Sequence, residues 1–285
     1  MNTSSEISPM AVMERETRVC HGPVADSVRG IHVPPGQNNL VGDEFLIREA
    51  GLACHYRKGA GITVQMDDPE KAGTLELLLA GSVYAAIAAI NGFLPVHASA
   101  VEIGGVAIAF TGAAGAGKST TVAGLRQRGL PIVADDTVVL DMSGPRPLVL
   151  PGHKRLKLWP DSLELTGMSG LQLVSEAYPK FFATEGGSEL DGPVPLGAIV
   201  SLVVGEEPAF DAVRGAARIA LLDDDHYTAD YHAVAQGLDH GGRLRAIAAL
   251  ANSVPAYRYV RPLDPVRFAE SIDFLFAKVA EVAAG

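Results

Sequence analysis

The segment GAAGAGKST at residues 112–120 has the residue types and the spacing of a phosphate-binding loop. Gly112 is followed by four residues and then by Gly117, Lys118 and Ser119, which is the P-loop pattern. Glycines let successive backbone N–H groups curl around phosphate oxygens, where Cβ atoms would obstruct the turn. In this pattern the lysine contacts the β- and γ-phosphates and the serine hydroxyl binds Mg²⁺. The sequence therefore predicts a site for ATP and Mg²⁺. Its predicted nucleotide-binding residues are Gly112, Ala113, Ala114, Gly115, Ala116, Gly117, Lys118, Ser119 and Thr120.

The segments on either side of this loop favour phosphate binding over a flexible turn in a chain rich in glycine and alanine. The preceding GVAIAFT at 105–111 has the apolar run of a buried strand. The following STTVAGLRQRG at 119–129 has apolar residues at helical spacing and ends on a glycine that can cap a helix. The positive N-terminal end of this helix is then expected to point at the loop.

Two adjacent aspartates, Asp135 and Asp136, end the apolar run that follows the predicted P-loop helix. Folds of this kind place a Mg²⁺ ligand or a catalytic base at such a strand end. Adjacent strand residues point to opposite faces, so the two carboxylates cannot face the nucleotide in the same way. We expect one to meet the phosphates and the other to cap a turn or hold a neighbouring loop.

The order of His97, the P-loop and RGLPIVADD at 128–136 resembles the HPr kinase/phosphorylase family, whose P-loop kinases phosphorylate a serine of a protein. In that family an active-site histidine lies 21 residues before the P-loop lysine, as His97 does before Lys118. The family's base is the second aspartate of the pair, 18 residues after the lysine, which corresponds to Asp136. The resemblance implies catalytic roles for Asp136, His97 and Lys118, with Asp135 beside them, and Mg²⁺ ligands Ser119 and Asp136. Without it, His97 would more simply be a partly buried histidine with satisfied hydrogen bonds.

The resemblance is specific over residues 92–141 and has two departures. Thr120 stands where members that act on HPr have an acidic residue, and the family's glycine-rich catalytic stretch is not recognisable in 151–167. The chain instead resembles a divergent bacterial branch with LPVHASAV, KLWPD and VPAYRYVRP, which includes kinases of lasso-peptide precursors. The implied fold is α/β: a P-loop kinase core of HPr-kinase type with a mixed central sheet flanked by helices, plus a small, mostly β N-terminal subdomain.

The resemblance implies an ATP- and Mg²⁺-dependent kinase that phosphorylates a serine hydroxyl of a peptide or small protein. The expected acceptor is the C-terminal serine of a lasso-peptide precursor. One alternative is an HPr(Ser) kinase/phosphorylase of sugar-uptake regulation. The others are a P-loop ATPase or small-molecule kinase, which needs no peptide groove, and a nucleotide-sensing module, which would tolerate loss of Asp136.

Composition limits the partners and the compartment. A net charge of −10, from 23 basic and 33 acidic residues, disfavours nucleic acid and anionic membrane surfaces. Two cysteines are too few for a disulfide framework, which favours reduced thiols and the cytoplasm. Residues 77–96 are uncharged and long enough for a bilayer, but Asn91-Gly92 and Pro95 interrupt them. We therefore expect a buried, alanine-rich helix at 75–90 and no membrane partner.

The chain is expected to have three parts: a flexible N-terminus at 1–16, a small β-rich subdomain at 17–72 and a P-loop kinase domain at 73–285. Apolar residues at helical spacing predict a docked C-terminal helix within 264–283. The basic segment HKRLK at 153–157 is either a clamp for phosphates or an acidic peptide, or a solvated strand. The HPr branch commonly forms hexamers, but the departures favour a monomer or homodimer.

Overall fold

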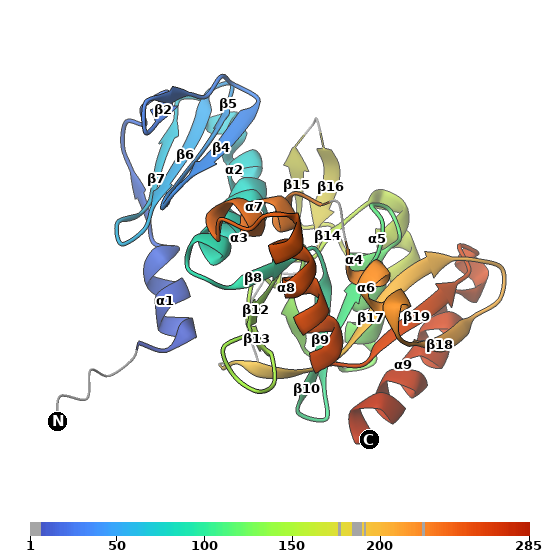
Figure 1. Ribbon diagram of the computed structural model, residues 1–285. Coiled ribbons are helices and arrows are strands. Elements are labelled where there is room, and N and C mark those ends of the chain that lie inside the picture. The colour runs from blue at the N-terminus through green and yellow to red at the C-terminus, as the bar shows by residue number, and fades with distance from the viewer. Residues whose placement is uncertain (1–6, 176–177, 184–189, 191, 224–225) are drawn as a thin grey trace. The chain divides into compact units, whose positions relative to one another are not determined.

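The computed structural model describes residues 7–175, 178–183, 190, 192–223 and 226–285. The chain forms two compact units (Figure 1). Unit 1 comprises Met1–Pro95 and Tyr227–Leu238, and unit 2 comprises Val96–His226 and Asp239–Gly285. The strand β8 (Leu94–Val96) lies at the junction of the two ranges.

Unit 1 is built on a five-stranded sheet in the order β1-β7-β6-β5-β4. Strands β4 to β7 pair with their sequence neighbours in an antiparallel meander, and β1 pairs with β7 in parallel. The turn glycines Gly42 and Gly59 adopt positive φ angles of 61° and 82°, which suit tight hairpins. The strands are β1 (Val19–His21), β4 (Gln37–Val41), β5 (Glu44–Glu49), β6 (Leu52–Arg57) and β7 (Gly61–Met66), with the separate pair β2 (Ser27–Val28) and β3 (Ile31–His32).

The apolar helix expected at 75–90 is two helices that break at Gly81. The second, α3 (Ser82–Ile90), is buried from Val83 onward and packs on β5 and β6, which confirms a buried, alanine-rich helix. The stretch Pro69–Ile90 is long and apolar enough to cross a membrane by length and composition, and 56% of its most apolar part is buried. A core helix passes the same test, so this stretch is weak evidence for a membrane span. The other helices of unit 1 are α1 (Pro9–Glu16), η1 (Pro69–Lys71), α2 (Ala72–Ala80) and α7 (Tyr227–Ala235).

The structure differs from the expected domain limits at three places, one of which is that Tyr227–Leu238, expected in the kinase domain, belongs to unit 1. Residues 9–16 form α1 rather than a flexible terminus, because Ser8 caps the helix and the buried Glu16 closes it. The Glu16 carboxylate accepts hydrogen bonds from Tyr56 Oη and Gly59 N, both at 2.8 Å. The two apolar helices belong to unit 1, so the division falls at 95/96 instead of 72/73.

Unit 2 is built on a mixed sheet in which the long strand β17 (Val194–Val204) is central. It pairs in parallel with β10 and with β19, and antiparallel with β13. The dipeptide Gly104-Gly105 forms the turn between β9 and β10, which pair antiparallel. The remaining bounds are β9 (Ser99–Ile103), β10 (Val106–Thr111), β11 (Ile132–Ala134), β12 (Val138–Asp141), β13 (Leu148–Leu150), β18 (Ala209–Val213) and β19 (Ala256–Arg261).

Helices flank this sheet, and α9 (Phe268–Ala284) packs against β9, β17 and α4 (Lys118–Gln127), as its red ribbon in Figure 1 shows. Its apolar residues Phe268, Ile272, Leu275 and Val279 are buried, which confirms the docked C-terminal helix. A small sheet of β14 (Lys157–Leu158), β16 (Tyr178–Phe182) and β15 (Gln172–Ser175) adds a further layer. The other helices are α5 (Pro160–Thr166), α6 (Ala216–Leu222), α8 (His240–Ser253) and η2 (Pro265–Arg267). The predicted α/β fold with a mixed central sheet is confirmed.

Candidate functional site

The P-loop connects β10 to α4, in the strand–loop–helix order that the sequence predicts. Gly112, Gly115 and Gly117 have φ angles of +135°, +81° and +90°, which side chains rarely permit. A Cβ atom on Gly112 would lie 2.7 Å from the carbonyl oxygen of Leu202, so this glycine also allows close packing. The Lys118 ammonium donates to the carbonyl oxygen of Gly112 at 2.8 Å and thereby lies against its own loop.

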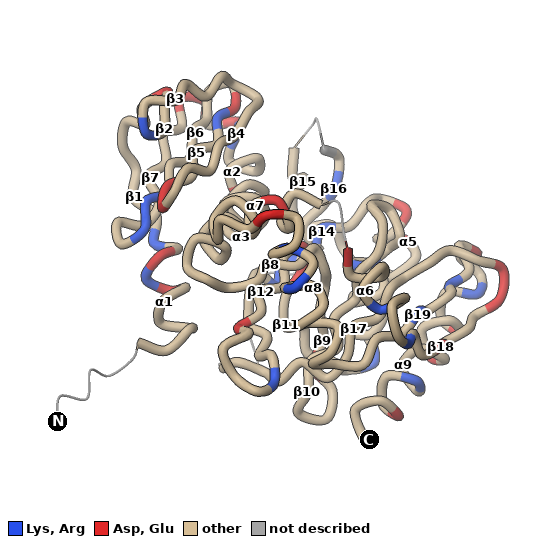
Figure 2. Tube along the Cα trace, in the orientation of Figure 1, with Lys and Arg blue, Asp and Glu red and all other residues tan. Residues whose placement is uncertain are grey.

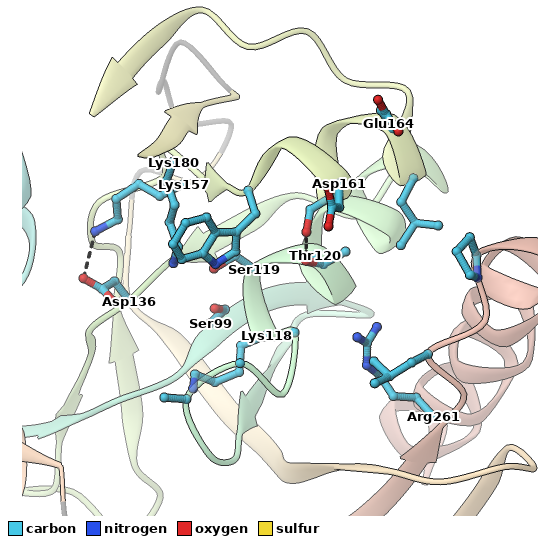
Figure 3. Close-up of a pocket in the computed structure, with 18 of the residues that line it drawn as sticks. Ser99, Lys118, Ser119, Thr120, Asp136, Lys157, Asp161, Glu164, Lys180 and Arg261 are labelled. Carbon is cyan, nitrogen blue, oxygen red and sulfur yellow. Dashed lines mark hydrogen bonds and ion pairs between the residues drawn. The ribbon is translucent and has the colours of Figure 1, made fainter. Parts of the chain in front are cut away.

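The loop forms one wall of a cavity of about 780 Å³ whose lining residues all belong to unit 2 (Figure 3). Further walls come from β14, from α5 and from the segment that follows β19. β16 has one basic position, blue in Figure 2, and this residue, Lys180, also lines the cavity. The cavity is therefore bordered by the P-loop and by side chains that could recognise an anionic ligand.

Asp135 directly follows β11 and is buried, with 2% of its surface exposed. Its Oδ1 accepts hydrogen bonds from Ser99 Oγ at 2.6 Å and from the P-loop Ser119 Oγ at 2.9 Å. Its Oδ2 is buried and has no hydrogen-bond partner among the described residues. Burial raises the pKa of this carboxyl, although the Lys157 charge acts against the increase. A serine hydroxyl beside a carboxylate with a spare oxygen fits Mg²⁺, which prefers oxygen ligands.

Figure 3 shows Asp136 apart from Ser119, with a dashed line from its carboxylate to a lysine. Its Oδ2 accepts a hydrogen bond from the buried Lys157 Nζ at 2.8 Å. Burial raises the pKa of the Asp136 carboxyl, but the charge and the hydrogen bond of Lys157 outweigh burial and lower it overall. The metal pair of Ser119 and Asp136 stays a prediction; the structure differs from it in that the carboxylate hydrogen-bonded to Ser119 is that of Asp135. Adjacent residues that face different ways explain the difference.

His97 lies beside Asp136, as its predicted place in the site requires. Its Nδ1 is 3.0 Å from the Asp136 carbonyl oxygen and 3.9 Å from the Asp136 Oδ1. A carbonyl oxygen only accepts, so Nδ1 carries the proton. Burial and then the Lys118 charge lower the pKa of His97 to about 4, so the ring is neutral at physiological pH. The ring also stacks on His226, with 3.7 Å between the ring centroids.

The basic side chains of the segment 153–157 lie in different surroundings. Lys154 and Lys157 are buried, so the interpretation as a wholly solvated strand is wrong for these two residues. Lys157 reaches Asp136, whereas the Arg155 guanidinium lies 4.0 Å from the centre of the Phe182 ring. Only Lys157 of this segment lines the cavity.

The polar cavity residues that sequence reasoning missed include Ser99, Ser162 and Arg261. Ser99 bonds Asp135, and Ser162 accepts a hydrogen bond from Thr120 Oγ1 at 3.0 Å. Arg261 ends β19 and lies against the P-loop glycine Gly117. The resemblance includes the segment VPAYRYVRP, which contains Arg261, but no local pattern marks any of the three residues as part of a phosphate site.

The comparisons with known proteins identify no family for the chain. No family model matches it, and no curated protein matches it. A solved structure, the Hpr(Ser) kinase/phosphatase from Coxiella burnetii, is similar at 12% sequence identity and a TM-score of 0.31, over 65% of this chain and 97% of that one. Similarity at this level assigns no residue a role, so function is argued from the geometry of the cavity.

Proposed function

We propose that this chain is a P-loop phosphotransferase that moves the γ-phosphoryl group of ATP to a hydroxyl acceptor. One observation supports this assignment above the others: a single cavity is lined by the P-loop and by a carboxylate that a buried lysine holds in place. Lys118 and Ser119 belong to the loop, and Asp136 is the carboxylate. A site that only binds nucleotide has no need of a second carboxylate held by a buried lysine.

The nucleotide end of the site uses Lys118, Ser119 and Asp135. The Lys118 ammonium neutralises charge on the β- and γ-phosphate oxygens, as P-loop lysines do. Ser119 and Asp135 would hold Mg²⁺, which supplies further charge neutralisation when it is bound. The fit rests on Asp135, whose Oδ1 accepts from the Ser119 hydroxyl and whose buried Oδ2 has no hydrogen-bond partner among the described residues.

The acceptor end uses Asp136, Lys157 and His97. A carboxylate with a lowered pKa is ionised at neutral pH, so Asp136 can accept a hydrogen bond from the acceptor hydroxyl and orient its oxygen toward phosphorus. As the new O–P bond forms and the bond to the leaving diphosphate breaks, the hydroxyl proton passes to Asp136. Lys157 and the neutral His97 hold the carboxylate and the backbone of Asp136 in place.

The acceptor that we propose is a peptide serine, and specifically the C-terminal serine of a lasso-peptide precursor in the cytoplasm. The sequence resemblance suggests this acceptor, and two lysines support it. Lys157 and Lys180 line the cavity together with the half-exposed Trp159, whose ring lies 5.4 Å from Lys180 Nζ. A C-terminal serine carries a carboxylate next to its hydroxyl, and such lysines suit that anion. We also propose a monomer or homodimer, which light scattering would measure.

Mass spectrometry of candidate peptides tests the proposal. The protein is incubated with Mg²⁺-ATP and peptides that end in serine, and the matched controls end in alanine or in a serine amide. We expect the mass of one phosphate to be added to the serine peptide only, and chelation of Mg²⁺ to stop the reaction. If the peptide that ends in a serine amide is phosphorylated at the same rate, the terminal carboxylate has no role in recognition. ATP hydrolysis without any phosphorylated acceptor would contradict the transferase assignment.

A further inference from the structure

Arg261 is a buried arginine that forms no ion pair with any residue that the structure describes. It lines the cavity and is only 7% exposed. Its Nε is buried and has no hydrogen-bond partner in the part of the chain that the structure describes. Burial lowers the pKa of Arg261, which reflects the same unfavourable environment. An uncompensated buried charge is costly, so the native environment is incomplete without an anion.

The guanidinium lies directly against the P-loop. A Cβ atom on Gly117 would be 2.6 Å from Arg261 Nη2 and 2.7 Å from Arg261 Cζ. The absence of a side chain at Gly117 therefore admits the guanidinium to the phosphate-binding loop. Figure 3 shows Arg261 and Asp136 on opposite sides of Lys118, so Arg261 is remote from the carboxylate that orients the acceptor.

We propose that Arg261 binds the α- or β-phosphate of the nucleotide, at the end of the cavity away from phosphoryl transfer. A planar guanidinium donates two parallel hydrogen bonds to phosphate oxygens, which supplies the missing anion. The inference rests on the proposed function, because it requires a nucleotide in the P-loop. It adds a phosphate contact that is not part of the P-loop pattern, and it assigns this contact to the α- or β-phosphate, both of which ATP and ADP share.

Titration with ATP and with ADP tests this assignment. Trp159 is the only tryptophan and lines the cavity, so its fluorescence or calorimetry can follow binding. Arg261→Gln should weaken both nucleotides by about tenfold or more, and by the same factor, because charge-assisted bonds to the shared phosphates are lost. Arg258→Gln is the matched control, since Arg258 lies on the same strand and is exposed. It should leave both affinities unchanged.

Two results would overturn the assignment. If folded Arg261→Gln binds both nucleotides with unchanged affinity, Arg261 does not contact the nucleotide. If only the affinity for ATP falls, Arg261 contacts the γ-phosphate instead. Thermal melting without nucleotide checks folding, and if Arg261→Gln does not fold, Arg261→Lys is judged by the same criterion because it loses the fork of donors. If the wild-type protein binds neither ATP nor ADP, the proposed function itself is wrong. If the wild-type protein binds both and Arg261→Gln binds them equally well, only the role of Arg261 is wrong.

Discussion

Asp136 has a positive φ of +72°, in the left-handed region that residues with side chains rarely adopt. Such backbone strain persists where surrounding contacts hold the residue in place. Lys157 bonds the carboxylate, and the His97 ring donates to the carbonyl oxygen of the same residue. Side chain and backbone are thus fixed from two directions, and the carboxylate is oriented before an acceptor arrives.

Replacement of this carboxylate by an amide should separate catalysis from binding. In Asp136→Asn, transfer should fall by about a hundredfold or more, because the amide cannot accept the hydroxyl proton. Affinity for ATP should stay within several-fold, since Lys118 and Ser119 are unchanged. Phosphopeptide formation and Trp159 fluorescence measure the two quantities. Asp161→Asn is the control, because Asp161 lines the same cavity from α5 and is exposed. Full transfer in Asp136→Asn would remove Asp136 from the mechanism.

His97 should make stability depend on pH. Its pKa is about 4 in the fold against an ordinary value of 6.5, so between these values the unfolded chain binds more protons than the native state. The stability contributed by neutral His97 is present above pH 6.5 and is lost as pH falls toward 4. His97→Gln should reduce the dependence of unfolding free energy on pH by up to about 1.4 kcal/mol per pH unit in this window. Urea unfolding at several pH values measures it, and equal slopes in both proteins would refute it.

At the scale of elements, α4 approaches α9 closely at Gly124. A Cβ atom there would lie 2.8 Å from Ile272 Cδ1 and 3.1 Å from Phe268 Cζ, both on α9. The helix that carries the P-loop serine is therefore held against the C-terminal helix by a residue without a side chain. Overpacking at this contact would separate the two helices or force strained rotamers.

Gly124→Ala should destabilise the protein although alanine is the better helix former. Helix propensity favours alanine by about 1 kcal/mol, but overpacking costs about 1–3 kcal/mol, so we expect a net loss. Gly241→Ala is the matched control, since a Cβ atom on this α8 glycine would meet nothing closer than 3.5 Å. It should be neutral or stabilising. Denaturant midpoints measure both variants, and a Gly124→Ala variant as stable as wild type would show that the helices adjust freely.

The elements around the P-loop could be predicted because their signals are local. An apolar run, a glycine pattern and a helical repeat follow one another in 105–129, and β10 and α4 form there. The partners of Asp135 and of the P-loop come from distant segments: Ser99 from β9 and Arg261 from β19. Only the pairing of strands brings them together, and one sequence carries no signal for that pairing. The break at Gly81 was missed because apolar residues continue through it.

At the scale of the molecule, every residue that lines the cavity lies in unit 2, whereas Glu16 belongs to the core of unit 1. Glu16 is fully buried, and the hydrogen bonds from Tyr56, Gly59 and Arg15 lower the pKa of its carboxyl although burial raises it. It is therefore a charged acceptor that α1 supplies to the strands of unit 1. A substitution in unit 1 can therefore change stability while every residue that lines the cavity in unit 2 is kept.

Glu16→Ala should destabilise unit 1 without changing the affinity for nucleotide. Loss of the carboxylate leaves Tyr56 Oη and Gly59 N without their acceptor, at a cost of about 2–3 kcal/mol. Glu14→Ala is the control, because Glu14 is an exposed residue of the same helix and should change little. Mg²⁺-ATP at about 100 times its Kd should stabilise unit 2 by about 2.7 kcal/mol in all three proteins, since ligand linkage depends only on affinity. Calorimetric unfolding and an ATP titration below the first transition measure both effects. A fall in affinity that accompanies the destabilisation in Glu16→Ala would show that the cavity depends on unit 1.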